Sequence, residues 1–310
     1  MKNIIWLFFF AIVFLNYSCI KEVDLDFKQI DKQVVVNCLF CPDSLFNVHL
    51  SFSANPLDTN TEIIENAKIE LWSGFAKIDD LKYVGNGDYL SNVVANIETP
   101  YTIKIDVPEY EIIYATDTIP SKSDYNYVNN TAYCKEIESY LYSTLDFNIA
   151  DKIGSDYYNL SFPYTRSGYI DSNFITSFCW FQAESNVISN ETNNMIGNFY
   201  TNVIFSDSFF QNETQSFSID YETDKIFLPH AYSETIDTNL IVILQLNKIS
   251  FANYKYKKSV IQAEIINTLP DLYNTNQDFY IYSNITNGLG IFAGFNPIYD
   301  TLIYEGENYH

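Results

Sequence analysis

The sequence predicts a mainly β protein in which an antiparallel β-sandwich is followed by a second β-rich domain with one helix. Aromatic residues make up 17% of the chain, with 26 Tyr and 24 Phe, and residues of this kind favour strands. Short stretches of alternating apolar and polar residues recur about every ten residues, which is the spacing of strands in a sandwich. Among the later stretches, one repeats its apolar residues at helical spacing. These three observations predict the fold class.

The first 18 residues have the pattern of a secretory signal. A positive charge at Lys2 precedes an apolar run over Ile4–Leu15. As a helix, this run of about 12 residues would be roughly 18 Å long, which is too short to cross a membrane. Cys19 follows where a bacterial lipoprotein signal has its acylated cysteine. We therefore expect lipid attachment at Cys19; the alternative is an ordinary cleaved signal in which Cys19 has no role.

Residues 19–32 are predicted to form an acidic tether between the lipid and the first domain. Lys21 is followed by Glu22, Asp24 and Asp26, an order that resembles the surface-export signal of Bacteroidota lipoproteins. Two or more acyl chains on one protein give stable membrane anchoring. We expect a protein that is lipid-anchored to the outer membrane and faces the cell surface.

The chain is strongly acidic. It has 39 Asp and Glu against 17 Lys and Arg, which gives a formal net charge of −22 at pH 7. This excess argues against nucleic acid as a partner and against electrostatic attraction to anionic lipid head groups. Membrane contact is therefore expected through the acyl chains on Cys19.

Residues 33–120 are predicted to form the β-sandwich, whose expected role is that of a scaffold. The clearest strand is Phe46–Ser53, in which every second residue is apolar. The segment Gly85-Asn86-Gly87-Asp88 has the composition of a hairpin turn, because Gly and Asn tolerate positive φ. The other expected strands are Gln33–Phe40, Ala67–Trp72, Lys82–Val84, Tyr89–Leu90, Tyr101–Val107 and Ile112–Thr118.

Residues 121–130 are polar and rich in tyrosine, so we place a linker there, and residues 131–310 form the second domain. Leu240–Ile249 is the most hydrophobic stretch after the signal and is predicted to be the central strand of this domain. Further strands are expected over Glu136–Phe147, Tyr157–Phe162, Phe174–Ala183, Asn198–Phe205 and Gln215–Tyr221.

One helix is predicted directly after the central strand. Ser250 can cap its first turn, and apolar residues recur at helical spacing until Thr268 and Pro270 end it. Three lysines give this helix a small basic spot, which is either a solvated face or a docking patch: Lys255, Lys257 and Lys258.

The sequence predicts no metal site, cofactor or catalytic residue. Cys38 and Cys41 have the two-residue spacing of zinc and redox sites, but no second pair follows. Plain packing, a disulfide and a metal site remain alternatives for the four cysteines after Cys19, and we adopt packing: Cys38, Cys41, Cys134 and Cys179. The three histidines are isolated from one another and are not expected to be catalytic: His49, His230 and His310.

Tyrosines near the predicted linker are the best candidates for contact with a ligand or partner. Tyrosine offers a large contact area at a low cost in side-chain entropy and can stack on sugars or on protein surfaces. The alternative is that these side chains are half-buried in a sheet. The group consists of Tyr125, Tyr127, Tyr133, Tyr140 and Tyr142.

The tail of the chain carries a distinctive pattern. Tyr282-Ser283-Asn284-Ile285 is followed by Gly288-Leu289-Gly290-Ile291-Phe292, where the glycines permit a tight bend and a close approach between buried strands. This tail resembles the closing signature of DUF4249, a family of Bacteroidota lipoproteins. Val34-Val35-Val36-Asn37, Gly87-Asp88-Tyr89 and Tyr254-x-Tyr256 fit the same family, and the resemblance covers essentially the whole mature chain. It implies an immunoglobulin-like N-terminal sandwich, a β-rich C-terminal part and a place beside TonB-dependent receptors, and it brings no catalytic residues.

We therefore expect a non-enzymatic outer-membrane lipoprotein that is an accessory or cargo-binding partner of a TonB-dependent receptor-type barrel. Acylated Cys19 would tether it, the sandwich would act as a spacer, and the C-terminal domain would contact the barrel or its cargo. Two alternatives remain. One is a surface protein that binds or processes glycans, since catalytic carboxylate pairs are defined by their separation in space and not in sequence. The other is an envelope adhesin.

Overall fold

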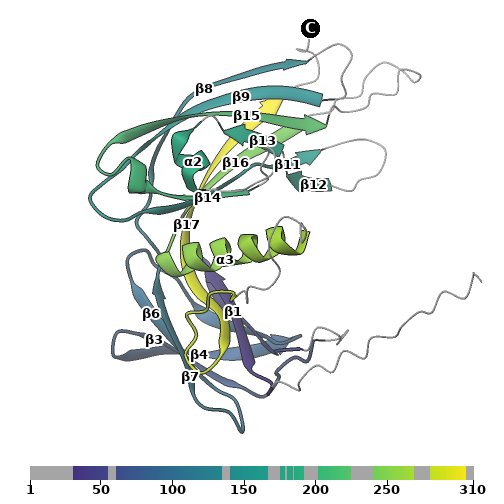
Figure 1. The fold of residues 1–310 in the computed structure, drawn as a ribbon. Coiled ribbons are helices and arrows are strands. Elements are labelled where there is room, and N and C mark those ends of the chain that lie inside the picture. Colours follow the sequence, from purple (N-terminus) through teal and green to yellow (C-terminus); the bar gives the residue numbers. More distant parts are fainter. Residues whose placement is uncertain are drawn as a thin grey trace, which may run out of the picture.

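Two β-rich lobes are connected by one long strand and flanked by one long helix (Figure 1). The computed structural model describes residues 31–54, 61–134, 140–166, 175–178, 180–183, 185–191, 202–224, 240–268 and 280–304. The expected signal, Cys19 and most of the expected tether lie outside these residues. The mainly β class predicted from the sequence is confirmed.

The N-terminal lobe has seven strands in the order β1-β2-β5-β4-β3-β6-β7, and neighbours in this order are antiparallel. Strand β4 pairs with β3 through residues 76–81 and with β5 through residues 82–85, so the sheet turns back on itself there. The strands are β1 (Val34–Phe40), β2 (Leu45–Phe52), β3 (Lys68–Ser73), β4 (Ala76–Gly85), β5 (Asp88–Val94), β6 (Pro100–Asp106) and β7 (Ile113–Thr118).

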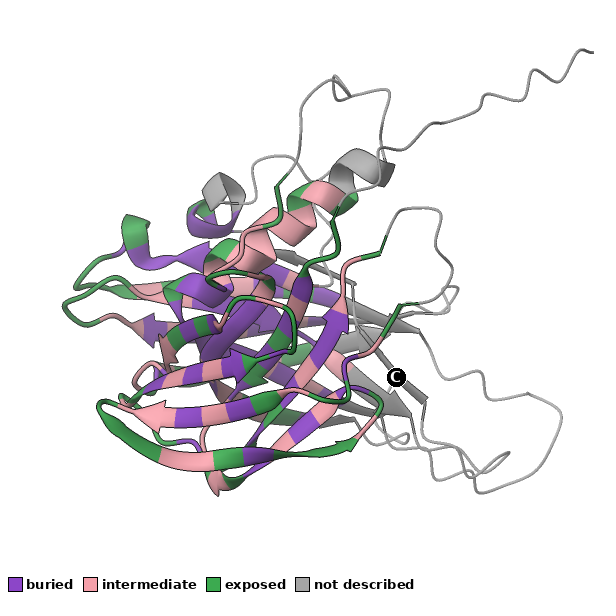
Figure 2. Ribbon diagram, turned by 90° about the horizontal axis from the view of Figure 1, so that it is seen from below, coloured by how far each residue is buried: buried purple, intermediate pink, exposed green. Residues whose placement is uncertain are grey.

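The core of this lobe follows from the alternation of side chains along its strands. In β1 every second residue from Val34 to Phe40 is buried, and Figure 2 shows the same alternation along the neighbouring strands. Leu71 on β3 and Ile103 on β6 are fully buried in the same cluster as Phe40. The two halves of the sheet therefore face each other across one apolar core.

Strand β17 (Leu289–Tyr304) belongs to both lobes. Its residues 289–294 pair with β1 in parallel, and its residues 295–304 pair in antiparallel fashion with β16 (Leu240–Ile249). This parallel pair corrects the expectation of purely antiparallel pairing in the first domain. The pattern within residues 33–120 shows which face of β1 is buried, but it does not show which distant segment covers the free edge of that strand.

Glycine is required where β17 meets β1. Gly290 lies opposite Val36 and has a φ of +103°, in the region that favours glycine. A Cβ atom at this position would lie 2.0 Å from the carbonyl oxygen of Val36. The sequence-based prediction of a close backbone approach at these glycines is confirmed.

The C-terminal lobe has two layers around a second core. One layer is a four-stranded sheet in the order β13-β15-β9-β8, and the other is built around β16, which pairs with β10, β11 and β17. Phe147 and Phe217 stack in the core between them, with ring centroids 5.1 Å apart. The remaining strands are β8 (Asp124–Cys134), β9 (Tyr140–Ala150), β10 (Tyr157–Ser161), β11 (Pro163–Arg166), β12 (Ile175–Phe178), β13 (Trp180–Ala183), β14 (Asn202–Ser206) and β15 (Thr214–Asp224).

Two sequence-based predictions concern this lobe: its central strand and the linker before it. The predicted central strand, Leu240–Ile249, is β16, and it has partners on both sides. The predicted linker at residues 121–130 needs correction, because residues 124–130 form the first part of β8. This stretch reads as polar because the outward residues of β8 are exposed, while Tyr125 packs against the core.

The predicted helix is confirmed as α3 (Phe251–Thr268). The backbone N–H of Asn253 donates to the Ser250 hydroxyl at 3.2 Å, so Ser250 is the cap that the sequence predicts. Ala252 packs against Ile291 and Ala293 of β17, and α3 lies across the junction of the lobes (Figure 1). The short helix α2 (Asn186–Glu191) and the 3-10 helix η1 (Asp207–Phe209) were not predicted. In the described part of the chain, no helix is both long and apolar enough to span a bilayer.

Candidate functional site

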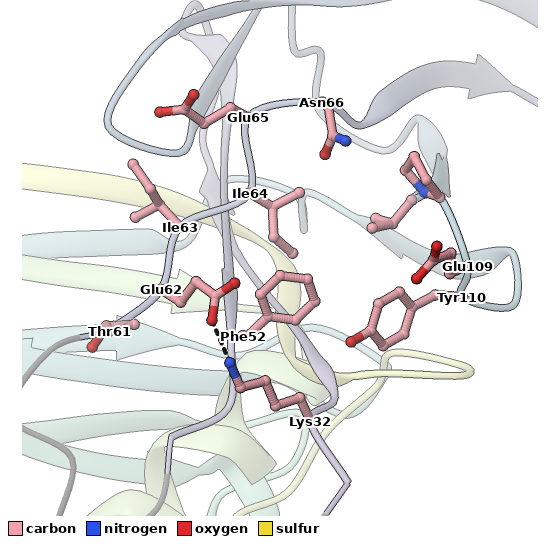
Figure 3. A pocket seen from close by; sticks show the side chains of 12 residues that line it. Lys32, Phe52, Thr61, Glu62, Ile63, Ile64, Glu65, Asn66, Glu109 and Tyr110 are labelled. Carbon is pink, nitrogen blue, oxygen red and sulfur yellow. Dashed lines mark hydrogen bonds and ion pairs between the residues drawn. The ribbon is translucent and has the colours of Figure 1, made fainter.

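An open groove of about 900 Å³ lies at one end of the N-terminal lobe (Figure 3). Its walls are the end of β2, the segment 61–66 and the turn 107–110. Lys32, at the beginning of the described chain, also lines it. The groove is therefore on the side of the lobe where the expected tether arrives.

Two aromatic side chains form the apolar part of the groove. The rings of Phe52 and Tyr110 have centroids 5.3 Å apart and an interplanar angle of 34°. Both side chains are partly buried and pack against the apolar core of the lobe. The ammonium group of Lys32 lies 6.0 Å from the centroid of the Phe52 ring, within the range of a cation–π contact.

Backbone hydrogen bonds fix the segment that forms one wall. The N–H of Phe52 donates to the carbonyl of Glu62 at 2.8 Å, and the N–H of Ile64 donates to the carbonyl of Leu50 at 3.1 Å. The hydroxyl of buried Tyr89 donates to the carbonyl of Ile64 at 3.0 Å. The segment 61–66 is thus attached to β2 and β5 although it forms no regular strand.

The opposite wall is a tight turn. The N–H of Tyr110 donates to the carbonyl of Val107 at 3.1 Å, and Glu109 between them has a φ of 72°. This geometry turns the chain so that the side chains of Glu109 and Tyr110 both lie along the groove (Figure 3).

Carboxylates surround the aromatic pair. Glu62 forms an ion pair with Lys32, and Glu65 accepts a hydrogen bond from the Tyr83 hydroxyl at 3.1 Å. Glu109 lies on the other side (Figure 3). The titratable side chains of the described lining are these carboxylates, Lys32 and Tyr110. An apolar floor with an acidic rim is suited to binding, and most directly to a ligand with an apolar face and hydrogen-bond donors.

The sequence-predicted tyrosines lie in the other lobe. Tyr125 is half-buried: its ring packs on Phe147 with centroids 5.5 Å apart, and its hydroxyl donates to Asp300 Oδ2 at 2.9 Å. Burial, together with the nearby carboxylate of Asp300, raises the pKa of the Tyr125 hydroxyl. Tyr127, two residues further along β8, is 45% exposed. Of these two, Tyr127 is the one that is accessible to a partner.

The other three tyrosines of the group belong to the same pair of strands. Tyr133 on β8 lies opposite Tyr142 on β9 in the strand register, and Tyr140 begins β9. The positions of their side chains lie outside the described part of the structure. The five tyrosines are therefore spread along the β8–β9 pair, away from the groove, and only Tyr133 and Tyr142 lie opposite each other.

The described cysteines are separate thiols. Cys38 is buried in the core of the N-terminal lobe, and this burial raises the pKa of its thiol to about 12. Cys41 is half-buried, with its sulfur 3.1 Å from the Ser44 hydroxyl. The side chain of Cys134 and all of Cys179 lie outside the described residues, as do Cys19, His230 and His310. His49 Nδ1 lies 3.0 Å from an oxygen of Asp88 on the outer face of the lobe.

The three predicted lysines of α3 do not form one exposed patch. The ammonium groups of Lys255 and Lys258 lie over the rings of Phe251 and Tyr254, at 5.4 and 5.5 Å from the ring centroids. Lys257 is half-buried, and desolvation lowers its pKa. Two of the three lysines, Lys255 and Lys258, therefore lie over aromatic rings of the same helix.

Sequence reasoning did not identify the groove. It placed Phe52 correctly on an alternating strand, but Tyr110 lies in a turn without a recognisable motif. The apolar pair Ile63-Ile64 in an otherwise polar loop is the signal that could have indicated a packed segment there.

Comparison with known proteins gives one match. A family model described as a domain of unknown function, DUF4249, matches residues 20–297. No curated protein matches the sequence.

Proposed function

Because the chain belongs to the DUF4249 family, we propose that it is a non-enzymatic, surface-exposed outer-membrane lipoprotein. In this proposal it is an accessory or cargo-binding partner of a TonB-dependent receptor-type barrel. Acylated Cys19 tethers the chain, the N-terminal lobe is an immunoglobulin-like spacer, and the C-terminal lobe contacts the barrel or its cargo. The observation that carries the proposal is the lipoprotein-type N-terminus. It precedes two β-rich lobes, one of which has an open groove with an aromatic floor.

The position of the family match supports the tether. The match begins at residue 20, directly after Cys19, which is where a mature lipoprotein would continue from its acylated cysteine. The acidic residues that follow cannot hold the chain on anionic lipids, so the acyl chains must do so. From Cys19 to Lys32 the extended chain spans at most about 45 Å.

In this proposal, the short tether gives the groove a role in the complex. The groove beside Lys32 would stay within that distance of the membrane surface, at the height where a barrel has its surface loops. Phe52 and Tyr110 offer an aromatic floor for an apolar side chain of the partner, and Glu62 and Glu109 offer acceptors for its donors. In the proposal, the N-terminal lobe is therefore more than a spacer: a segment of the barrel partner occupies this groove, in addition to the contact made by the C-terminal lobe.

The first experiment tests the anchor. Mass spectrometry of the mature N-terminus and protease treatment of intact cells should find an acylated Cys19 and a digested body. Cys19→Ser should release the protein from the membrane fraction. A free N-terminus in the soluble fraction would contradict the proposal.

The second experiment tests the partner. After cross-linking in intact cells, the purified lipoprotein should carry a barrel protein with it, and the double variant Phe52→Ala, Tyr110→Ala should carry at least tenfold less. Phe75→Ala is the matched control, because Phe75 is a fully exposed aromatic on the β3–β4 turn of the same lobe. Recovery of the wild-type protein alone would contradict the barrel partner.

Glycan binding is a second candidate, and the same groove favours it. An aromatic side chain beside carboxylates is a common arrangement for a sugar, whose ring stacks on the aromatic face while its hydroxyls donate to the acids. Retention on immobilised polysaccharide that is lost in the Phe52→Ala, Tyr110→Ala double variant and kept in Phe75→Ala would support this candidate. Co-purification of a barrel without any polysaccharide retention would support the first.

A further inference from the structure

Three carboxylates meet in the C-terminal lobe, away from the groove. Asp151 and Asp156 lie at the two ends of the β9–β10 turn, and Asp207 begins η1. One oxygen from each of the three side chains lies within 4.8 Å of the other two. Asp207 is only 2% exposed.

Backbone hydrogen bonds hold these residues in place. The N–H of Asp156 donates to Asp207 Oδ2 at 2.8 Å, and the N–H of Asp207 donates to the carbonyl of Asp156 at 3.0 Å. The N–H of Asn212 donates to Asp151 Oδ2 at 2.8 Å. The three side chains therefore come from two turns that are fastened to each other, so their proximity is built into the fold.

The charge of the cluster is only partly compensated by its lysine. Lys248 on β16 is 5% exposed, and its ammonium group lies 2.5 Å from Asp156 Oδ2 and 3.2 Å from the Ser121 hydroxyl. One ammonium beside three ionised carboxylates leaves two negative charges in a partly buried place, which is costly unless a cation or protons neutralise them. Desolvation raises the pKa of Asp207, and the nearby carboxylates add to the increase.

Two buried oxygens at this place have no hydrogen-bond partner among the residues that the structure describes. Asp151 Oδ1 is fully buried and accepts no hydrogen bond. Ser123 is 6% exposed and directly precedes Asp124, the first residue of β8, which pairs with Ala150, the residue before Asp151. Its hydroxyl lies close to that of Tyr158. Burial raises the pKa of Tyr158, and so does the charge of Asp156 and Asp151, which places this hydroxyl pair next to the carboxylates.

We propose that Asp151, Asp156 and Asp207 bind a hard divalent cation, Ca²⁺, with the unpartnered Asp151 Oδ1 and the Ser123 hydroxyl facing it. All the offered ligands are oxygens, which suits Ca²⁺ and disfavours metals that prefer nitrogen or sulfur. Bonds of 2.3–2.6 Å around one ion span ligand oxygens up to about 5 Å apart, which accommodates the spacing of the three carboxylates. The two charges that Lys248 leaves uncompensated match those of the ion.

Bound calcium would join three connections of the C-terminal lobe. The β9–β10 turn supplies Asp151 and Asp156, the β14–η1 connection supplies Asp207, and the segment before β8 supplies Ser123. The site thus has a structural role in this proposal, independent of what occupies the groove.

The test uses the mature protein, stripped with a chelator and dialysed into calcium-free buffer. Calcium titrated by calorimetry should bind with a stoichiometry of one, and millimolar calcium should raise Tm by several degrees. Asp151→Asn and Asp207→Asn should each weaken binding at least tenfold. Asp106→Asn, an exposed carboxylate on β6, is the matched control and should bind calcium as the wild type does.

A second readout covers variants that fold poorly. Terbium replaces calcium and luminesces when an adjacent tyrosine is excited, so wild-type protein should sensitise Tb³⁺ through Tyr158, and added calcium should abolish the signal. Wild-type protein with no calcium heat, no shift in Tm and no sensitised luminescence would overturn the proposal. Equal binding by Asp151→Asn and Asp207→Asn would overturn it as well.

Discussion

The hydroxyl of Ser250, which caps helix α3, donates a hydrogen bond to the carboxylate of Asp117 at the end of strand β7. The same carboxylate accepts the N–H of Gly294 on β17 at 2.9 Å. One half-buried acid of the N-terminal lobe therefore binds the first turn of the helix and the strand that runs between the lobes. The contact places a negative charge at the N-terminus of a helix, where the helix dipole favours it.

Asp117→Asn should change how stability depends on pH. Burial raises the pKa of Asp117 above its ordinary value of 3.8, although its hydrogen bonds act in the opposite direction. The folded protein then binds a proton more readily than the unfolded chain, so the contribution of Asp117 to stability is greatest at low pH and is lost as pH rises through the folded pKa.

The asparagine cannot ionise and keeps an oxygen acceptor for Ser250 or Gly294. The free energy of unfolding of the variant minus that of the wild type should therefore increase from pH 4 upward and become constant above the folded pKa. Urea unfolding at a series of pH values measures this difference. A difference that does not change with pH would contradict the prediction.

Ser250→Ala should destabilise the protein by about 1–2 kcal/mol, because it removes a helix cap. It also removes the donor to Asp117. Gln262→Ala is the control, since Gln262 is exposed on the same helix and should change stability by less than about 0.5 kcal/mol. Equal unfolding midpoints in urea for the two variants would show that the cap is unimportant.

Gly290→Ala should prevent the parallel pairing of β17 with β1, because the added Cβ would overlap the Val36 carbonyl. We expect a loss of at least about 3 kcal/mol or failure to fold. Gly74→Ala has positive φ as well, but no atom lies within 4 Å of the added Cβ, so it should cost only about 1 kcal/mol. Thermal unfolding followed by circular dichroism compares the two, and similar Tm values would contradict the predicted steric overlap.

Tyr125→Phe should cost about 1 kcal/mol by removing the hydrogen bond to Asp300. Tyr127→Phe, on the same strand with a side chain 45% exposed, should leave the unfolding midpoint unchanged within error. Chemical unfolding of both variants measures the difference. If the two variants behaved alike, Tyr125 would contribute through its ring contact with Phe147 alone.

Much of the fold could be predicted because its signals are local. The alternation in β1 and β2, the hydrophobic run of β16 and the cap, period and stop of α3 each lie within one stretch of sequence. The pairing of β17 with β1 could not be predicted, because the two segments lie at opposite ends of the chain. No local pattern in either segment indicates which strand it pairs with. The first part of β8 lies in the predicted linker, because the residues that face solvent make this stretch polar.

The candidate sites were less accessible to sequence reasoning than the fold. The groove depends on Phe52 and Tyr110 meeting across a gap of more than fifty residues, and the turn that holds Tyr110 has no motif. The acidic cluster combines a turn with a distant 3-10 helix, so its spacing in sequence matches no calcium loop. Both sites are formed by turns and loops from distant parts of the chain, and a single sequence does not show which turns come together.

Strand β17 pairs with strands of both lobes, and this determines the order in which the chain can fold. As the protein is made from its N-terminus, β1 emerges about 250 residues before the glycine-containing segment that completes its edge, and contacts of such long range form slowly. Until then the edge of β1 is open to pairing with other chains, which is a route to aggregation. The N-terminal lobe therefore reaches its final form only once the last strand has been delivered, and a chain shortened before residue 289 would lack part of both lobes at once.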